Sequence, residues 1–134
     1  MTTHSNPTLA AWAPRLLSVL RIVTGFLFLW HGTQKLFGFP PSDHGPAELM
    51  SLMGLAGVLE FGGGLLFLLG LFTRPVAFLL SGTMAVAYFM AHAGQGALPI
   101  QNGGEPAVLY CFVFLYYVAA GAGPWSLDAL RGRA

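Results

Sequence analysis

The chain has 134 residues, a length typical of one domain. Hydrophobic residues make up 55% of it and charged residues only 8%, and the mean hydropathy is +0.67. A soluble domain needs more surface charge than this, so the composition indicates an integral protein in contact with the lipid bilayer. The net charge of +1 lacks the basic excess of a nucleic-acid-binding protein, and we expect no nucleic-acid partner.

Four apolar segments are candidates for membrane-spanning helices, each of which needs about 20 residues. We predict them over residues 16–37, 47–72, 75–98 and 105–120. Gly and Pro residues mark most of their ends, and the connection between the second and third segments leaves room only for a tight turn. The sequence therefore predicts an all-α fold, an integral membrane four-helix bundle that forms a single domain over residues 1–134.

The first apolar segment follows a polar N-terminus, with Arg15 and Arg21 around its start. No A-x-A-like cleavage site follows it, so we interpret it as an uncleaved first span rather than as an export signal.

Basic residues near the segment ends fall on one side of the predicted bundle. They are Arg15, Arg21, Arg74, Arg131 and Arg133, whereas the connections on the other side carry only the acidic residues Asp43, Glu48 and Glu105. Because cytoplasmic loops carry an excess of Lys and Arg, this distribution predicts that both termini lie in the cytoplasm.

Cys111 is the single cysteine of the chain. One cysteine excludes an internal disulfide, a CxxC redox pair and a zinc–thiolate cluster within one chain. Thiol–disulfide chemistry would therefore need a partner protein or a second subunit, and we predict no metal ligand set.

Several charged and polar side chains lie within or beside the apolar segments. A charged group at membrane depth costs roughly 3 kcal/mol or more, so such groups generally face the bundle interior and are candidates for function. The first and third segments run in the same direction, and the helical rise places His31 and His92 at a similar depth in the outer half. The candidate catalytic residues are His31, Lys35, Glu60 and His92. The candidate cofactor-binding residues are His31, Lys35, Tyr88, His92, Gln95 and Glu105.

Helical spacing places small and polar residues on common faces, where they favour close helix packing. The first segment has Arg21, Gly25, Phe28, Gly32 and Lys35 on one face. The second has Gly57, Glu60 and Gly64, and the third has Ser81, Ala85, Tyr88, His92 and Gln95. We expect these three faces to line a common interior.

Structural roles for the same residues are the alternatives. Lys35 can extend to the headgroups without a function, Arg21 can mark the inner interface by binding a lipid phosphate, and the two histidines can be hydrogen-bonded core residues. Glu60 is a short carboxylate near mid-span that cannot reach water easily. We therefore predict that it is protonated, or paired with Lys35 or a histidine.

Four motifs occur in order along the chain and together carry a family resemblance. They are Arg21-x-x-x-Gly25 with Gly32-x-x-Lys35-Leu36; Gly57-x-x-Glu60-x-x-Gly63-Gly64 continuing to Leu69-Gly70-Leu71 and Thr73-Arg74; Asn102-Gly103-Gly104-Glu105; and Gly121-x-Gly123-x-Trp125-Ser126-Leu127-Asp128. From about residue 16 to residue 130 the chain resembles the DoxX family of small four-helix bacterial membrane proteins.

This resemblance implies a multi-pass protein of the bacterial plasma (inner) membrane. Some relatives are membrane subunits of a thiosulfate:quinone oxidoreductase, and others are linked to membrane oxidoreductase complexes. The resemblance therefore implies a subunit of a quinone-linked redox complex that has a protein partner. Whether the chain itself is an enzyme stays open.

A quinone is the cofactor that the polar residues suit best, because its two carbonyl oxygens accept hydrogen bonds and take up protons on reduction. His31, His92, Lys35 and Tyr88 are the expected donors, and Glu60 or Glu105 the expected proton relays. The main alternative is a non-enzymatic membrane anchor or assembly subunit with a structural buried polar network.

Two further interpretations are less favoured. Haem ligation by His31 and His92 fits their matched depth, but no haem motif accompanies them. A transporter fits poorly, since four helices without evident repeats offer little for alternating access unless the chain forms a homo-oligomer.

Overall fold

The computed structural model describes residues 6–134, and its secondary structure there is entirely helical. The long helices are α1 (Pro7–Phe37), α2 (Leu52–Leu69), α3 (Thr73–Ala91) and α5 (Glu105–Ala120), and the short ones are the 3₁₀ helix η1 (Ala93–Gln95), α4 (Pro99–Asn102) and α6 (Leu127–Leu130). Helices α1, α2 and α3 are long and apolar enough to cross a membrane, and α5 is a shorter apolar helix. The predicted all-α membrane fold is confirmed.

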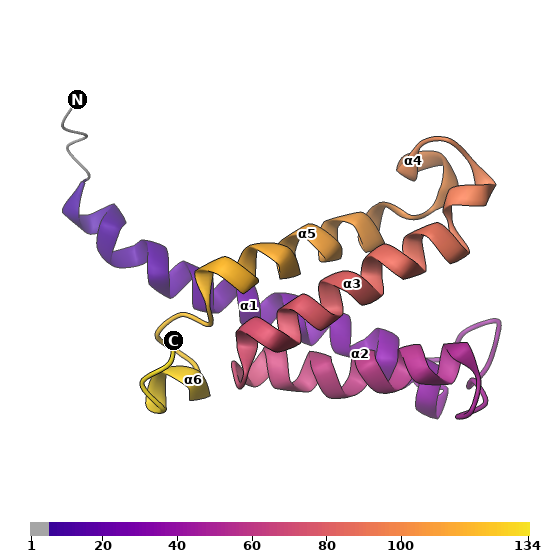
Figure 1. The fold of residues 1–134 in the computed structure, drawn as a ribbon, viewed down its shortest axis with the longest axis horizontal. Helices are drawn as coiled ribbons and strands as arrows, with labels where there is room; N and C mark the ends of the chain where they lie inside the picture. Colours follow the sequence, from indigo (N-terminus) through magenta and orange to yellow (C-terminus); the bar gives the residue numbers. More distant parts are fainter. Residues whose placement is uncertain (1–5) are drawn as a thin grey trace.

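The four long helices form two antiparallel pairs, α1 with α2 and α3 with α5 (Figure 1). The pairs meet where the turn between α2 and α3 lies close to α6, and they diverge toward the opposite end in this view. We call the first end, with the α2–α3 turn and residues 121–134, the tail end. The other end, with the connections at residues 38–51 and 92–104, is the loop end.

The first two helices differ in length from the predicted spans. Helix α1 begins at Pro7, nine residues before residue 16, because the Asn6 side chain accepts a hydrogen bond from Thr8 N–H and Pro7 suits a first helical turn. Its first turns project beyond the bundle (Figure 1). Helix α2 is shorter than the predicted 47–72, since Ser51 caps its start and Gly70, with φ of 68°, ends it in the left-handed region.

The third helix begins earlier and ends earlier than predicted. Its first residue is Thr73 rather than residue 75, and the chain leaves the α-helix after Ala91. The 3₁₀ helix η1 and irregular backbone occupy the predicted residues 92–98, and α4 follows them. Helix α5 covers the same residues as the fourth predicted segment. Its 16 residues span about 24 Å, less than the roughly 30 Å hydrocarbon core.

Glycines bring α1 and α2 into close contact. A Cβ atom added at Gly25 would lie 2.9 Å from the Leu68 backbone, and one at Gly32 would lie 2.7 Å from Phe61 Cα. The predicted glycine faces are therefore present at this interface, and they fix an antiparallel register in which Gly32 lies opposite Glu60 and Phe61.

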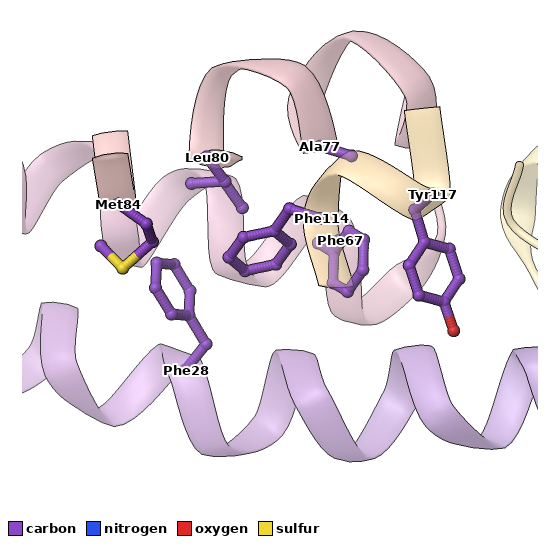
Figure 2. Packing of buried hydrophobic residues seen from close by; sticks show 7 residues of the cluster. All are labelled: Phe28, Phe67, Ala77, Leu80, Met84, Phe114 and Tyr117. Atoms are coloured by element: carbon purple, nitrogen blue, oxygen red, sulfur yellow. The ribbon is translucent and has the colours of Figure 1, made fainter. Parts of the chain in front are cut away.

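Aromatic side chains fill the space between the two helix pairs. The ring of Phe28 from α1 packs edge-on against Phe114 from α5 at a centroid distance of 4.9 Å, and Phe67 from α2 packs against the same ring at 4.9 Å. Figure 2 shows these rings with Tyr117, whose hydroxyl points toward α1 and donates a hydrogen bond to Leu17 O. All four rings are fully buried and form the core together with Ala77, Leu80 and Met84.

Arg21 holds the tail end together. Its side chain is 1% exposed, and its guanidinium donates hydrogen bonds to Ala122 O, to Trp125 O at 2.7 Å and to Leu68 O at 3.4 Å. Three carbonyls from two distant segments thus share one arginine, whose planar fork suits such multiple contacts. The interpretation in which Arg21 binds a lipid phosphate is wrong, because the two terminal nitrogens of its guanidinium are bonded to protein carbonyls.

Asp128 caps α3 from the tail. Its carboxylate accepts hydrogen bonds from Phe72 N–H at 3.0 Å and Thr73 N–H at 2.9 Å, the first backbone donors of the helix. Burial by itself raises the pKa of the Asp128 carboxyl, but the backbone donors of Thr73 and Phe72 and the nearby Arg131 hold this pKa below its ordinary value. A residue more than 50 positions away in the sequence therefore sets where α3 starts.

Candidate functional site

Lys35 and Glu60 form an ion pair across the α1–α2 interface. The Nζ atom of Lys35 lies 2.7 Å from Oε2 of Glu60, and the side chains are 22% and 4% exposed. The pairing predicted for Glu60 is present. Helix register explains it, because Gly32 and Gly57 remove the side chains that would separate the two helices at this level.

His31 lies beside this pair on α1. Its ring faces Tyr110 of α5 at a centroid distance of 5.9 Å and Phe28 at 6.3 Å, and it feels the charges of both Glu60 and Lys35. Among residues 6–134, no side chain or main-chain group makes a hydrogen bond to this ring, which is exposed on the bundle surface. The three residues form what we call the pair site: Lys35, Glu60 and His31.

A surface hollow lies beside Lys35 toward the loop end. It has a volume of about 450 Å³, and Lys35 is part of its wall. The other lining residues are Gln34, Ser42, His44, Gly45, Ala47, Glu48, Ser51 and Met53. Lys35 therefore lies between this surface hollow and the buried Glu60.

His92 belongs to a second polar group, built on α3 and the connection to α5. Its Nδ1 atom lies 3.0 Å from Asn102 O, and its ring lies 6.5 Å from the Tyr88 ring. The Asn102 side chain, 4% exposed, donates to Tyr88 Oη and to Gly96 O at 3.1 Å each and accepts from Gly104 N–H at 2.8 Å. This group closes the loop end of the α3–α5 pair.

The remaining candidates are exposed at the loop end. Gln95 donates its side-chain amide to Ala91 O within its own segment, and Glu105 lies in the first turn of α5. In the part of the chain from residue 6 onward, no hydrogen bond or ring contact links His31 with His92. The structure thus brings Lys35, Glu60 and His31 together and places the other candidates elsewhere.

Two residues contribute to the polar groups more than the sequence indicated. Asn102 is the hub of the second polar group, and the Asn-Gly-Gly run gave a signal, because Asn side chains often bond to the backbone two residues later. Tyr110 is not among the candidate residues predicted from the sequence, yet its ring forms one wall beside His31.

The fold and the buried ion pair define a small all-α membrane protein with a polar site set in an apolar bundle. The DoxX family model matches residues 16–93, more than half of the chain, and the chain belongs to the DoxX family.

Relatives match nearly the whole chain. The chain is 48% identical over 125 residues to an uncharacterized protein of Haemophilus influenzae, an alignment that covers 90% of this chain and 93% of the relative. It is 30% identical over 131 residues to the inner membrane protein YqjF of Escherichia coli strain K12, with 86% and 91% covered. No solved structure matches the chain.

Proposed function

We propose that this protein is the membrane subunit of a quinone-linked redox complex and that the pair site binds the quinone head. The observation that carries the proposal is the Lys35–Glu60 pair, a charged pair within the bundle whose lysine also lines a surface hollow. Charged groups of this kind inside apolar helices are costly and are commonly functional.

The donor set fits a quinone head. Lys35 offers ammonium hydrogens and His31 offers a ring nitrogen without a protein partner among the described residues, so two carbonyl oxygens can be bound. Phe28 and Tyr110 supply aromatic walls next to His31.

Reduction of a quinone to a quinol takes up two electrons and two protons. In this proposal a redox centre of the partner subunit supplies the electrons. Lys35 and His31 orient the head by hydrogen bonds, and the Glu60 carboxylate relays the two protons one after the other. His92 and Tyr88 contribute less to binding, because their polar atoms close the loop around Asn102.

The orientation proposed for this subunit has both termini in the cytoplasm of a bacterium, with the protein in the inner membrane. Arg74 supports it, since its guanidinium lies at the C-terminal end of α5 and donates to Val118 O at 2.8 Å and to Ala119 O. Arg131, stacked 4.4 Å from the Phe72 ring centroid, lies at the same tail end. Basic residues at one end favour that end as cytoplasmic.

Quinone retention tests the proposal. Protein purified in mild detergent is extracted with organic solvent, and the quinone content per chain is measured by liquid chromatography. We expect wild-type protein to retain quinone, and His31→Leu and Lys35→Met to lose at least about 90% of it, a change worth about 1.4 kcal/mol of binding. His44→Ala, which changes the hollow but not the pair, is the matched control and retains quinone. Wild-type protein without quinone, with no quinone-dependent activity beside its native partner, contradicts the proposal.

The alternative is an anchor or assembly subunit without a ligand. One observation favours it: Lys35 and Glu60 already satisfy each other, as a structural pair would. A further support is an apolar hollow of about 620 Å³ between α1 and α5, lined in part by Leu16, Leu20 and Tyr116, where a partner helix can pack. A Lys35→Met/Glu60→Leu variant that still assembles with the partner and still supports its activity would favour this function over quinone binding.

A further inference from the structure

The two sides of the Lys35–Glu60 pair differ in their access to the protein surface. Toward the loop end, Lys35 lines the surface hollow while its Nζ atom remains 2.7 Å from Glu60. Gly57 makes room for the lysine stem, because a Cβ atom added there would lie 3.0 Å from Lys35 Cβ. One side chain therefore connects the surface of the protein with the buried carboxylate.

Toward the tail end, close-packed aromatic rings cover the pair. Gly64 lies one turn beyond Glu60 on α2, and its Cβ position would lie 3.3 Å from the Phe28 ring. Phe28 is fully buried and packs on Phe114, which packs on Phe67, which packs on Tyr117 at a centroid distance of 5.0 Å (Figure 2). Of these four rings only Tyr117 carries a polar atom, and its hydroxyl donates a hydrogen bond to Leu17 O. The rings of Phe28, Phe114 and Phe67 are apolar, fully buried and close-packed, and such packing excludes water from this side of the pair.

The titratable groups near Glu60 lie beside it or toward the loop end. Helix α1 contributes Lys35 and His31, and α5 contributes Tyr110 through its contact with the His31 ring. The hollow adds His44 and Glu48. Toward the tail end, the nearest charged residue of α1 is Arg21, eleven positions or about 16 Å from Gly32. Its two terminal nitrogens donate to Ala122 O, Trp125 O and Leu68 O.

We propose that Glu60 exchanges protons and water only with the loop end of the protein, and that Lys35 controls this exchange by bridging the hollow and the carboxylate. The inference concerns the protein alone and holds whatever ligand the pair site takes. Its consequence for redox chemistry, that protons for quinone reduction enter from the loop side, rests on the proposed function.

A water-soluble carbodiimide tests this access in the unmodified protein. The reagent activates the Glu60 carboxylate, the Lys35 amine displaces the activating group, and an amide joins the two side chains while one carboxylate oxygen leaves in the urea. The reagent is added to sealed right-side-out and inverted membrane vesicles, and the joined α1–α2 peptide is measured by mass spectrometry. Glu48 at the loop end and the C-terminal carboxylate at the tail end, each coupled to glycine ethyl ester, report that the reagent reached that side.

We expect the joined peptide to form at least about tenfold faster when the reagent is on the Glu48 side, because a close-packed apolar layer excludes the polar reagent. Equal rates from both sides, faster reaction from the C-terminal side, or no joined peptide from either side while Glu48 reacts would overturn the proposal.

Cysteine access gives an independent measurement. In a Cys111→Ser background, Lys35→Gln/Glu60→Cys removes both charges of the pair, so no charge is left buried alone. Met53→Cys in the hollow is the accessible control, and Ala77→Cys in the buried core is the inaccessible one. An impermeant thiol reagent should label positions 53 and 60 from the same side and position 77 from neither. Labelling of position 60 from the opposite side, or from neither side, contradicts loop-end access.

Discussion

The ammonium nitrogen of Lys35 and a carboxylate oxygen of Glu60 lie 2.7 Å apart across the α1–α2 interface, and only the lysine reaches the protein surface. The pair therefore has two parts with different environments. Removing either partner leaves the charge of the other unpaired. The loss of stability should differ between the two cases, so single substitutions can measure it.

Replacement of Glu60 should destabilise the protein. Glu60→Leu leaves the Lys35 ammonium beside an apolar side chain, and we expect a loss of about 3 kcal/mol, the low end for a broken buried pair because Lys35 is partly hydrated. Glu60→Gln keeps a hydrogen-bond acceptor and should cost less, and Lys35→Met/Glu60→Leu should recover most of the stability. Thermal unfolding in detergent measures the order of the melting temperatures of these variants. Wild-type melting for both single variants would show that the pair contributes nothing to stability.

The tail end should depend on Arg21. Arg21→Met removes the donors to Ala122, Trp125 and Leu68 and leaves buried carbonyls unpaired, at a cost of about 1–3 kcal/mol for each polar group left without a partner. Arg21→Lys should rescue only part of this loss, since an ammonium cannot reproduce the planar fork. Limited trypsin digestion at Arg131 and Arg133 reports release of the tail. Arg15→Met, at an exposed arginine beside Trp12, is the control and should melt like wild type.

Asp128 should make stability sensitive to acid. Its pKa is lower in the folded protein than in the unfolded chain, so it contributes full stability above the unfolded value of 3.8 and loses that contribution as pH falls toward the folded value. Asp128→Asn should lower the melting temperature at pH 7 and flatten the decline of stability below about pH 4. An unchanged acid profile in this variant would assign the decline to other groups.

The α1–α2 interface should have no room for even one methyl group at Gly32. Gly32→Ala places a Cβ atom 2.7 Å from Phe61 Cα, so the helices must separate, and we expect a loss of about 2 kcal/mol or more. Gly82→Ala on α3 is the matched control, because no atom lies within 4 Å of its Cβ position. Alanine there should be neutral or stabilising by up to about 1 kcal/mol. Equal melting of the two variants would contradict the close packing.

Topology is tested by cysteine labelling in intact cells after Cys111→Ser. With both termini in the cytoplasm, an impermeant reagent should label a Ser42→Cys variant and leave an Arg133→Cys variant unlabelled until the membrane is permeabilised. The opposite pattern would show the reverse orientation of the protein, in which the loop end faces the cytoplasm.

Local sequence was enough to predict four apolar helices and the buried faces of the first two. The stripe from Arg21 to Gly32 is buried as its spacing predicts, because side chains three and four positions apart on a helix lie on one face. For Glu60 the sequence predicted either protonation or pairing with Lys35 or a histidine, since a carboxylate at membrane depth is costly, and the structure shows the pair with Lys35. These features depend on the helical spacing of residues and on the free-energy cost of burying a charge, and both can be read from a sequence.

Only the tertiary structure decided which polar residues meet. His31 and His92 have similar predicted depth, yet one lies beside Glu60 and the other bonds to Asn102, because the two helix pairs diverge toward the loop end. The start of α3 depends on Asp128, whose carboxylate supplies the cap from a distant part of the chain. Helical phase and depth place a side chain on its own helix, but the register and crossing of the helices, set by close contacts such as Gly32 on Phe61, decide its partner.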